Sequence, residues 1–84
     1  MIKLSLSEIY EKVSVMIIDQ LDIDPKNAVF PSASITGDLG ADSLDIIELE
    51  MTIEEEFGIS FKEKEVEEID DVQGLVELIN KKLV

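Results

Sequence analysis

One serine in the middle of the chain stands where a hydroxyl could do chemistry. Ser43 lies between Asp42 and Leu44, after an irregular segment and in the first turn of a long helical pattern. A serine hydroxyl in such a place can act as a nucleophile, but it is weak without an adjacent base. The chain holds no histidine and no cysteine, so the usual base is missing. An ordinary enzyme is therefore not expected.

The composition restricts the class of partner. The chain of 84 residues has 20 acids against 7 bases and a formal net charge of −13. So negative a field repels nucleic acid and anionic membranes, and it attracts basic protein surfaces. No apolar run approaches the roughly 20 residues that cross a bilayer, and the N-terminus lacks the core of a signal peptide. We expect one domain over residues 1–84, a cytoplasmic monomer without membrane insertion or nucleic-acid binding. The mature form of an organellar protein would have the same sequence features.

The segment around Ser43 is typical of the start of a helix that runs to about Phe57. Asp42 is the expected N-cap and Asp45 the third helical residue, because carboxylates there satisfy or offset the free N–H groups and the positive end of the helix dipole. Gly58 suits the stop, since glycine readily takes the left-handed conformation that ends many helices. Ser43 is thus predicted in the first turn of this helix.

Two apolar stripes run along this predicted helix. At 100° per residue, the stripe expected to face the core consists of Ile46, Leu49, Ile53 and Phe57. The second stripe lies nearly opposite and consists of Leu44, Ile47 and Met51. The acids beside or close to the second stripe are Glu48, Glu54 and Glu55. A small domain can hardly enclose a helix on both sides, so we predict that the second stripe is exposed until a partner covers it.

The segments before this helix must hold it in place. A capping box of Ser5 and Glu8 predicts a first helix. Its apolar residues at helical spacing are Ile9, Val13, Met16, Ile17 and Leu21. From Asp22 to Asp42 the periodicity fails and turn residues accumulate, which predicts a long loop that must be pinned. The expected pins are Ile23, Val29, Phe30, Ile35 and Leu39.

A calcium-binding loop that begins at Asp22 is excluded. Lys26, Asn27 and Ala33 occupy the positions that require an oxygen ligand, a glycine and a glutamate. No metal site is expected in this chain.

The C-terminal part completes an all-α pattern. Between Ile59 and Ile69 there is room for only a short helix, and Asp71 then caps a last helix. The apolar residues of that last helix are Val72, Leu75, Val76, Leu78, Ile79 and Leu83. The sequence therefore predicts a small four-helix bundle of three longer helices plus one short helix, with a long loop between the first and second helices.

The residues around Ser43 resemble a known family. The matching string is Asp38, Leu39, Gly40, Ala41, Asp42, Ser43, Leu44 and Asp45, followed by Glu48, Leu49, Glu54, Glu55, Glu56 and Phe57. In this string the chain resembles the type II acyl carrier proteins of fatty-acid synthesis, a phosphopantetheine-binding family, and the similarity extends from the first helix to about Gln73. The resemblance implies that Ser43 takes a covalent 4′-phosphopantetheine arm from coenzyme A. A separate phosphopantetheinyl transferase would supply the base and the metal ion.

The resemblance also assigns a role to the exposed side of the second helix. Family members are gripped there by basic patches on the transferase and on the fatty-acid synthesis enzymes. The positions that match this recognition surface are Asp42, Leu44, Asp45, Ile47, Glu48, Met51, Glu54 and Glu55. Contacts between exposed charges speed association more than they hold a complex together, as a shuttle requires.

An acyl pocket inside the bundle is a further implication of the resemblance. The positions that match it are Ile46, Ile53, Phe57, Phe61, Val66 and Ile69. Phe61 and Val66 are bulkier than the residues common in the family, which predicts weaker sequestration of long chains. Glu50 replaces a residue that is usually apolar there.

Several other functions compete with a fatty-acid carrier. Ala41 after Gly40 argues against peptidyl carriers, which usually have two glycines, and Leu44 argues against alanine carriers, which tend to have methionine. A dedicated carrier for a polyketide or a specialised lipid remains open, as does an acidic adaptor domain that takes no prosthetic group.

Overall fold

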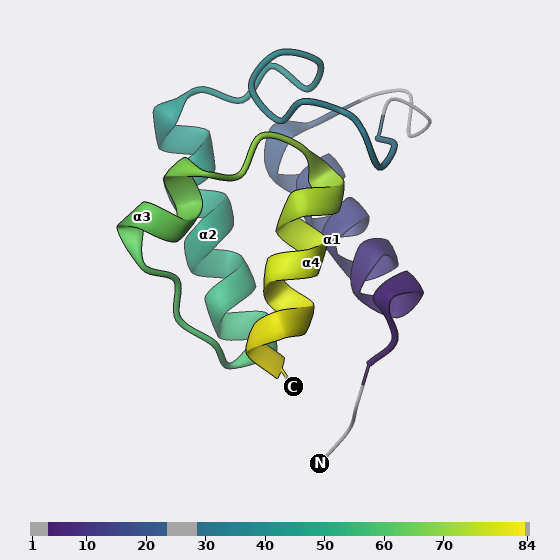
Figure 1. Cartoon of the computed structure of the whole chain (residues 1–84). Coiled ribbons are helices and arrows are strands. Elements are labelled where there is room, and N and C mark those ends of the chain that lie inside the picture. The colour runs from purple at the N-terminus through teal and green to yellow at the C-terminus, as the bar shows by residue number, and fades with distance from the viewer. Residues whose placement is uncertain (1–3, 24–28, 84) are drawn as a thin grey trace.

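The computed structural model describes residues 4–23 and 29–83, which form four helices. These are α1 (Leu6–Leu21), α2 (Ser43–Phe57), α3 (Glu63–Glu67) and α4 (Val72–Leu83). Figure 1 shows α2 and α4 running in the same direction, with α1 antiparallel to both and the short α3 beside them. The predicted all-α fold of three longer helices and one short helix is confirmed.

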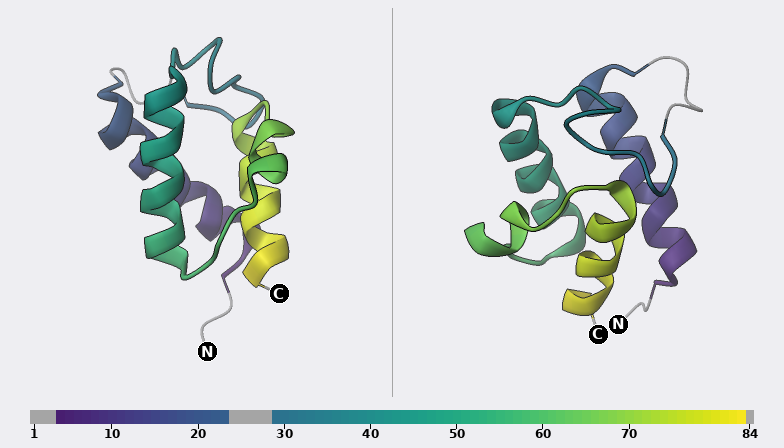
Figure 2. Two further views of the ribbon diagram at one scale, coloured as in Figure 1. Left: turned by 90° about the vertical axis from the view of Figure 1, so that its left-hand side faces the viewer. Right: turned by 45° about the horizontal axis from the view of Figure 1, so that its top comes forward.

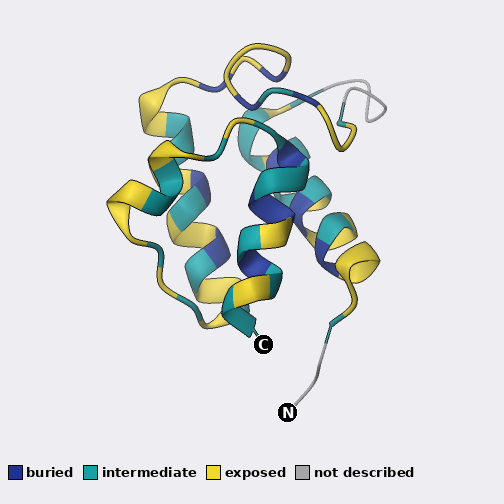
Figure 3. Ribbon diagram, viewed as in Figure 1, coloured by how far each residue is buried: buried dark blue, intermediate teal, exposed yellow. Residues whose placement is uncertain are grey.

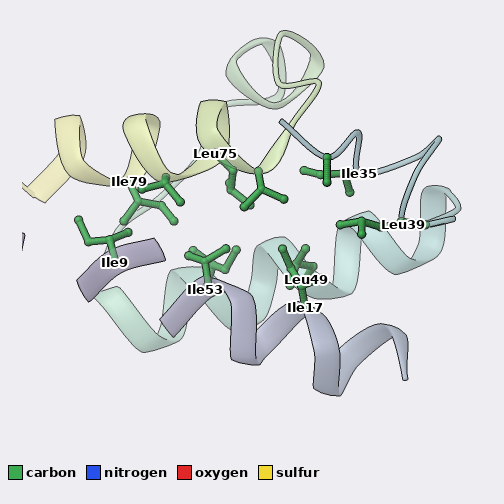
Figure 4. Close-up of a cluster of buried hydrophobic side chains, with 13 residues drawn as sticks. Ile9, Ile17, Ile35, Leu39, Leu49, Ile53, Leu75 and Ile79 are labelled. Atoms are coloured by element: carbon green, nitrogen blue, oxygen red, sulfur yellow. The ribbon is translucent and has the colours of Figure 1, made fainter. Parts of the chain in front are cut away.

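The core lies where the three longer helices face one another. Its buried members are Ile9, Val13, Ile17, Ala33, Ile35, Leu39, Ala41, Leu49, Ile53, Val72, Leu75, Val76 and Ile79. Figure 4 shows Ile17 of α1 and Leu49 of α2 meeting in this cluster, with Leu75 of α4 across from them. The buried side of each longer helix follows the apolar spacing that the sequence predicts (Figure 3). Helix periodicity thus accounts for most of the core.

The first helix begins as its sequence dictates. The Glu8 N–H donates to Ser5 Oγ (3.2 Å) and the Ser5 N–H donates to Glu8 Oε1 (2.9 Å), so the predicted capping box is confirmed. α1 makes the principal helix contacts with both α2 and α4. It is therefore the element against which the other two long helices are set.

The long loop before α2 is fixed to the start of α4 by backbone hydrogen bonds. The Ile35 N–H donates to the Asp70 carbonyl (3.1 Å), and the Val72 N–H donates back to the Ala33 carbonyl (3.1 Å). The Gln73 N–H reaches the Pro31 carbonyl at 2.8 Å. Figure 2 shows the loop crossing the end of the bundle at which α2 and α4 begin. The described part of the loop, residues 29–42, has no helix of its own, yet several of its backbone N–H and carbonyl groups are paired.

The apolar pins of this loop are only partly those that the sequence predicts. Ile35 and Leu39 are buried, and Ile23 and Val29 pack half-buried against the core, which confirms four of them. The prediction that Phe30 pins the loop is wrong. Phe30 opens a tight turn in which its carbonyl accepts the Ala33 N–H, and the residue is left 42% exposed. The excluded calcium loop falls partly on residues 24–28, outside the described residues.

Two alanines of the loop, and not Phe30, are buried against the bundle. Ala33 and Ala41 are buried in the loop although no periodicity marks them. A small side chain suits these places because the loop backbone lies within hydrogen-bond distance of α4 at residue 33 and of the Ile35 carbonyl, earlier in the same loop, at residue 41.

The last two helices are joined by an ion pair. Lys82 Nζ in the final turn of α4 lies 2.8 Å from Glu65 Oε1 of α3, and both residues are half-buried. The same Oε1 accepts the Lys62 N–H at 2.8 Å, so one carboxylate holds the start of α3 and ties it to α4. At the other end Asp71 caps α4, as predicted, because its Oδ1 accepts the Gly74 N–H at 2.8 Å.

The Glu65–Lys82 pair predicts a difference in acid stability. The hydrogen bond from Lys82 and then the Lys62 N–H lower the pKa of Glu65. A carboxyl whose pKa is lower in the folded state stabilises the fold above its unfolded pKa, and this stabilisation is lost as pH falls through the folded pKa. We therefore expect the wild-type melting temperature to fall more steeply than that of Lys82→Met between about pH 5 and pH 3.

The control for this prediction is Lys81→Met. Lys81 lies next to Lys82 in the same turn but is exposed and has no ion pair among the described residues. The Lys81→Met variant loses the same charge as Lys82→Met but keeps the ion pair. Its melting temperature should therefore fall with pH as that of the wild type does. Parallel profiles for Lys82→Met and Lys81→Met would contradict the assignment.

Candidate functional site

The start of α2 leaves the Ser43 hydroxyl free. The Asp45 N–H donates to Asp42 Oδ1 (2.9 Å) and the Asp42 N–H donates to Asp45 Oδ2 (3.1 Å). Asp42 is the N-cap and Ser43 the first helical residue, as predicted. Because Asp42 performs the capping, the Ser43 side chain is exposed and has no hydrogen-bond partner within residues 4–23 and 29–83. A hydroxyl in this condition is available to take a covalent group.

The loop immediately before α2 sets the position of this hydroxyl. Leu39 and Ala41 are both buried, and between them Gly40 has a φ of 72°, a conformation that favours glycine. The Ala41 N–H donates to the Ile35 carbonyl at 3.1 Å. Two buried side chains and one backbone hydrogen bond therefore hold the chain just ahead of Asp42. The backbone before Ser43 is therefore held in one position even though the loop is irregular.

The second apolar stripe of α2 lies on the surface. Leu44, Ile47 and Met51 are 63%, 52% and 57% exposed, so the predicted exposure is confirmed. Glu48 and Glu55 beside them are exposed as well, and Asp45 is half-buried. The structure thus places apolar and acidic side chains side by side next to Ser43. We call this set, with Asp42 and Glu54, the acidic docking face.

Glu54 differs from the other acids of the acidic docking face. It is half-buried, and its Oε2 accepts the Phe61 N–H at 2.8 Å. The hydrogen bond fixes the segment that leads from α2 to α3. No sequence rule pairs a helix carboxylate with an N–H seven residues further along, so the sequence did not indicate this structural use.

A cavity of about 540 Å³ opens between α2, α3 and the start of α4. Its apolar lining is formed by Ile35, Ile46, Ile47, Leu49, Ile53, Phe61, Val66, Ile69 and Leu75. Five of the six positions predicted for an acyl pocket are therefore brought together. Phe57 does not line the cavity, because it lies one turn beyond Ile53 at the end of α2 and packs half-buried against the core. Ser43 lies in the cavity wall as well.

The cavity wall also carries polar groups that the sequence did not assign to it. They are Thr36, Glu50, Glu63, Glu67 and Asp70. Glu50 is half-buried, and its pKa is raised, first by burial and then by the nearby charge of Glu54. The spacing of Glu50, seven residues after Ser43, places both on one side of the helix and could have indicated it.

Two further features concern metal binding and membrane crossing. Within residues 4–23 and 29–83, no group of three or more acidic side chains is arranged to hold a metal ion. None of the helices in those ranges has the length and apolar character that a membrane crossing requires.

Comparison with known proteins identifies similar chains. The family model described as the phosphopantetheine attachment site matches residues 2–79. The acyl carrier protein of Thermosynechococcus vestitus is 48% identical over 77 residues, which cover 92% of this chain and 94% of that protein. The acyl carrier protein of Petrotoga mobilis is 42% identical over 76 residues, covering 90% and 88%. The solved acyl carrier protein of Enterococcus faecalis has a TM-score of 0.77 at 29% identity and covers 94% of this chain and 99% of that one.

The capping arrangement at Ser43 predicts different effects of two substitutions at Asp42. Asp42→Ala removes the oxygen that accepts the Asp45 N–H, whereas Asp42→Asn keeps an acceptor there. We expect the free energy of unfolding of the alanine variant to be about 1 kcal/mol lower than that of the asparagine variant. Both variants lose the same charge, so the difference in urea unfolding reports the cap alone. Equal stabilities would show that the cap does not hold the start of α2.

Proposed function

Since this chain belongs to the acyl carrier protein family, whose model describes a phosphopantetheine attachment site, we propose that Ser43 is the residue that takes the arm. The observation that supports this most strongly is the free, exposed Ser43 hydroxyl at the first residue of α2, with Asp42 in the capping position. Ser43 is also the one serine among the described residues that lines the cavity.

The residues around Ser43 fit a phosphopantetheine group. A helix N-terminus favours a phosphate, because its free N–H groups and dipole offset negative charge. The carboxylates of Asp42 and Asp45 already accept backbone N–H groups of this turn, which moderates their repulsion of a phosphate. The cavity beside Ser43 has room for a chain linked to it.

The protein works as a carrier of fatty acyl chains and is not itself a catalyst. When bound, the arm supplies a thiol that holds acyl groups as thioesters. The chain itself supplies the hydroxyl, a helix start that presents it, and a cavity next to it. No residue of the site has to act as a base, because in this proposal a separate phosphopantetheinyl transferase activates Ser43.

Partner enzymes are proposed to land on the acidic docking face. Its exposed stripe of Leu44, Ile47 and Met51 offers apolar contact beside Ser43, and its carboxylates fit basic patches on the transferase and on fatty-acid synthesis enzymes. Exposed charges of this kind raise association rates while leaving release fast. The proposed place of action is the cytoplasm, and residues 1–84 are proposed to act as one carrier domain.

The cavity is proposed to shelter the acyl chain. Ile46, Ile53, Phe61, Val66 and Ile69 give it an apolar wall from three segments of the chain. Burial of methylene groups there would be favourable by about 0.8 kcal/mol each. The weaker sequestration of long chains that Phe61 and Val66 suggest remains a prediction.

Attachment to Ser43 is tested by intact mass. Incubation of the wild type with coenzyme A and a broad-specificity transferase should add the mass of one phosphopantetheine, and Ser43→Ala should stay unchanged. Ser60→Ala is the matched control, because Ser60 is exposed and does not line the cavity. An unchanged wild-type mass would favour the adaptor without a prosthetic group, and modification of Ser43→Ala would place the arm elsewhere.

The acidic docking face is tested by a charge reversal. Glu48→Lys should lower the transferase kcat/KM for this protein by about 3- to 10-fold at low salt, since each exposed charge contact contributes modestly to encounter. The effect should shrink at high salt because the contact is screened. Glu77→Lys makes the same change at an exposed position of α4 and should have a much smaller effect. Equal losses in both variants would show that net charge, not this face, governs the reaction.

A further inference from the structure

One carboxylate interrupts the apolar wall of the cavity. On α2 the residues Ser43, Ile46, Glu50 and Ile53 all line the cavity and follow one another at helical spacing. Glu50 therefore stands between two isoleucines, two turns or roughly 10 Å along the helix axis from Ser43. A chain that entered the cavity along α2 from the Ser43 end would pass this carboxylate.

Glu50 is without a polar partner in the part of the chain that the structure describes. Neither of its carboxylate oxygens takes part in a hydrogen bond or an ion pair among the described residues, although the side chain is half-buried. The acids that face the same space are Glu63 and Glu67 from α3 and Asp70 from the connection to α4. No lysine or arginine lines the cavity within the described ranges. The hydrogen-bonding capacity of Glu50 is thus left for water or for a ligand.

We propose that Glu50 selects the cargo, so that the cavity holds an acyl chain bearing a hydroxyl group in preference to a saturated chain of the same length. The inference rests on the proposed carrier function and names the class of cargo that its cavity takes. A saturated chain beside Glu50 removes water from the carboxylate and returns no hydrogen bond, which is unfavourable. A hydroxyl in the same place donates a charge-assisted hydrogen bond.

The apolar part of the lining favours a neutral donor over a cationic one beside Glu50. Glu63, Glu67 and Asp70 are exposed, whereas half-buried Glu50 is flanked by isoleucines on α2, and Phe61 and Val66 line the same cavity. An ammonium group would have to give up its water to enter this apolar space, whereas a hydroxyl gives up far less. The raised pKa of Glu50 agrees with a carboxylate that lacks full hydration.

The proposal is tested with the full chain carrying two cargoes of equal length. Octanoyl- and 3-hydroxyoctanoyl-phosphopantetheine are loaded on the wild type, Glu50→Val and Glu77→Val, and each product is verified by mass. The readout is the melting temperature relative to the same protein with an unacylated arm. In the wild type the hydroxylated cargo should raise it by about 4 °C more than the saturated one.

The variants separate selection by Glu50 from a general effect. In Glu50→Val the saturated cargo should stabilise at least as much as the hydroxylated one, and Glu77→Val should keep the wild-type preference. Equal shifts for the two cargoes in the wild type, or the same preference in Glu50→Val, would overturn the proposal. If no acyl-phosphopantetheine can be attached to the wild type, the proposed attachment to Ser43 is contradicted instead. Failure of the carrier proposal and failure of the Glu50 proposal therefore give different results.

The pH dependence gives a second readout. As pH falls through the raised pKa, Glu50 becomes neutral and the unfavourable contact with a saturated chain weakens, so the wild-type preference should shrink. The other acids near this space, Glu54, Glu63, Glu67 and Asp70, are all kept in Glu50→Gln, which should show no such loss. A preference that falls with pH in both proteins would assign the effect to those other acids and overturn the role of Glu50.

Discussion

The site depends on a few backbone hydrogen bonds between the loop at residues 31–35 and the start of α4 at residues 70–73. Residues 29–42 form an irregular segment, and holding it in one shape without such pairing would carry a large cost in conformational entropy. The pairing buries Ala33 and Ile35 against the bundle and, through the Ala41 N–H, fixes the chain one residue before the α2 cap. Ser43 is therefore positioned by the beginning of a helix that lies far from it in sequence.

The same arrangement explains why a cavity exists in so small a bundle. α1 packs against both α2 and α4, and these two helices start at the same end of the molecule (Figure 1). α3 covers the space left between them, because Glu65 binds Lys82 of α4 while Glu54 of α2 accepts the N–H of Phe61 just before α3. A five-residue helix has little stability of its own, so its place is set by these two carboxylates. The cavity is a consequence of how α3 is attached.

Local rules let the sequence predict all four helices and the placing of Ser43. Capping boxes, a glycine stop and apolar spacing involve residues within a few positions of one another, and Ser5, Asp42 and Gly58 behave accordingly. The errors and omissions concern contacts between distant segments. Phe30 was expected inside and Ala33 was overlooked, because the close approach of the loop to α4 admits a methyl group where no pattern indicates one. Helical spacing places Glu50 on the same side of α2 as Ser43. Which element packs against that side depends on tertiary structure and cannot be read from the spacing.

Ser43 stands at the boundary between the two surfaces of α2, so the docking and the cargo holding that we propose would depend on each other. Turning by 100° per residue, Ile46, Glu50 and Ile53 lie to one side of Ser43, and Leu44, Glu48 and Met51 lie to the other. Ile47 belongs to both surfaces, since it is 52% exposed and also lines the cavity. A partner that buries Ile47 therefore covers part of the cavity wall in the same contact. Under the proposed function, an enzyme bound to the acidic docking face would therefore act on the cavity wall at Ile47 without a separate moving element.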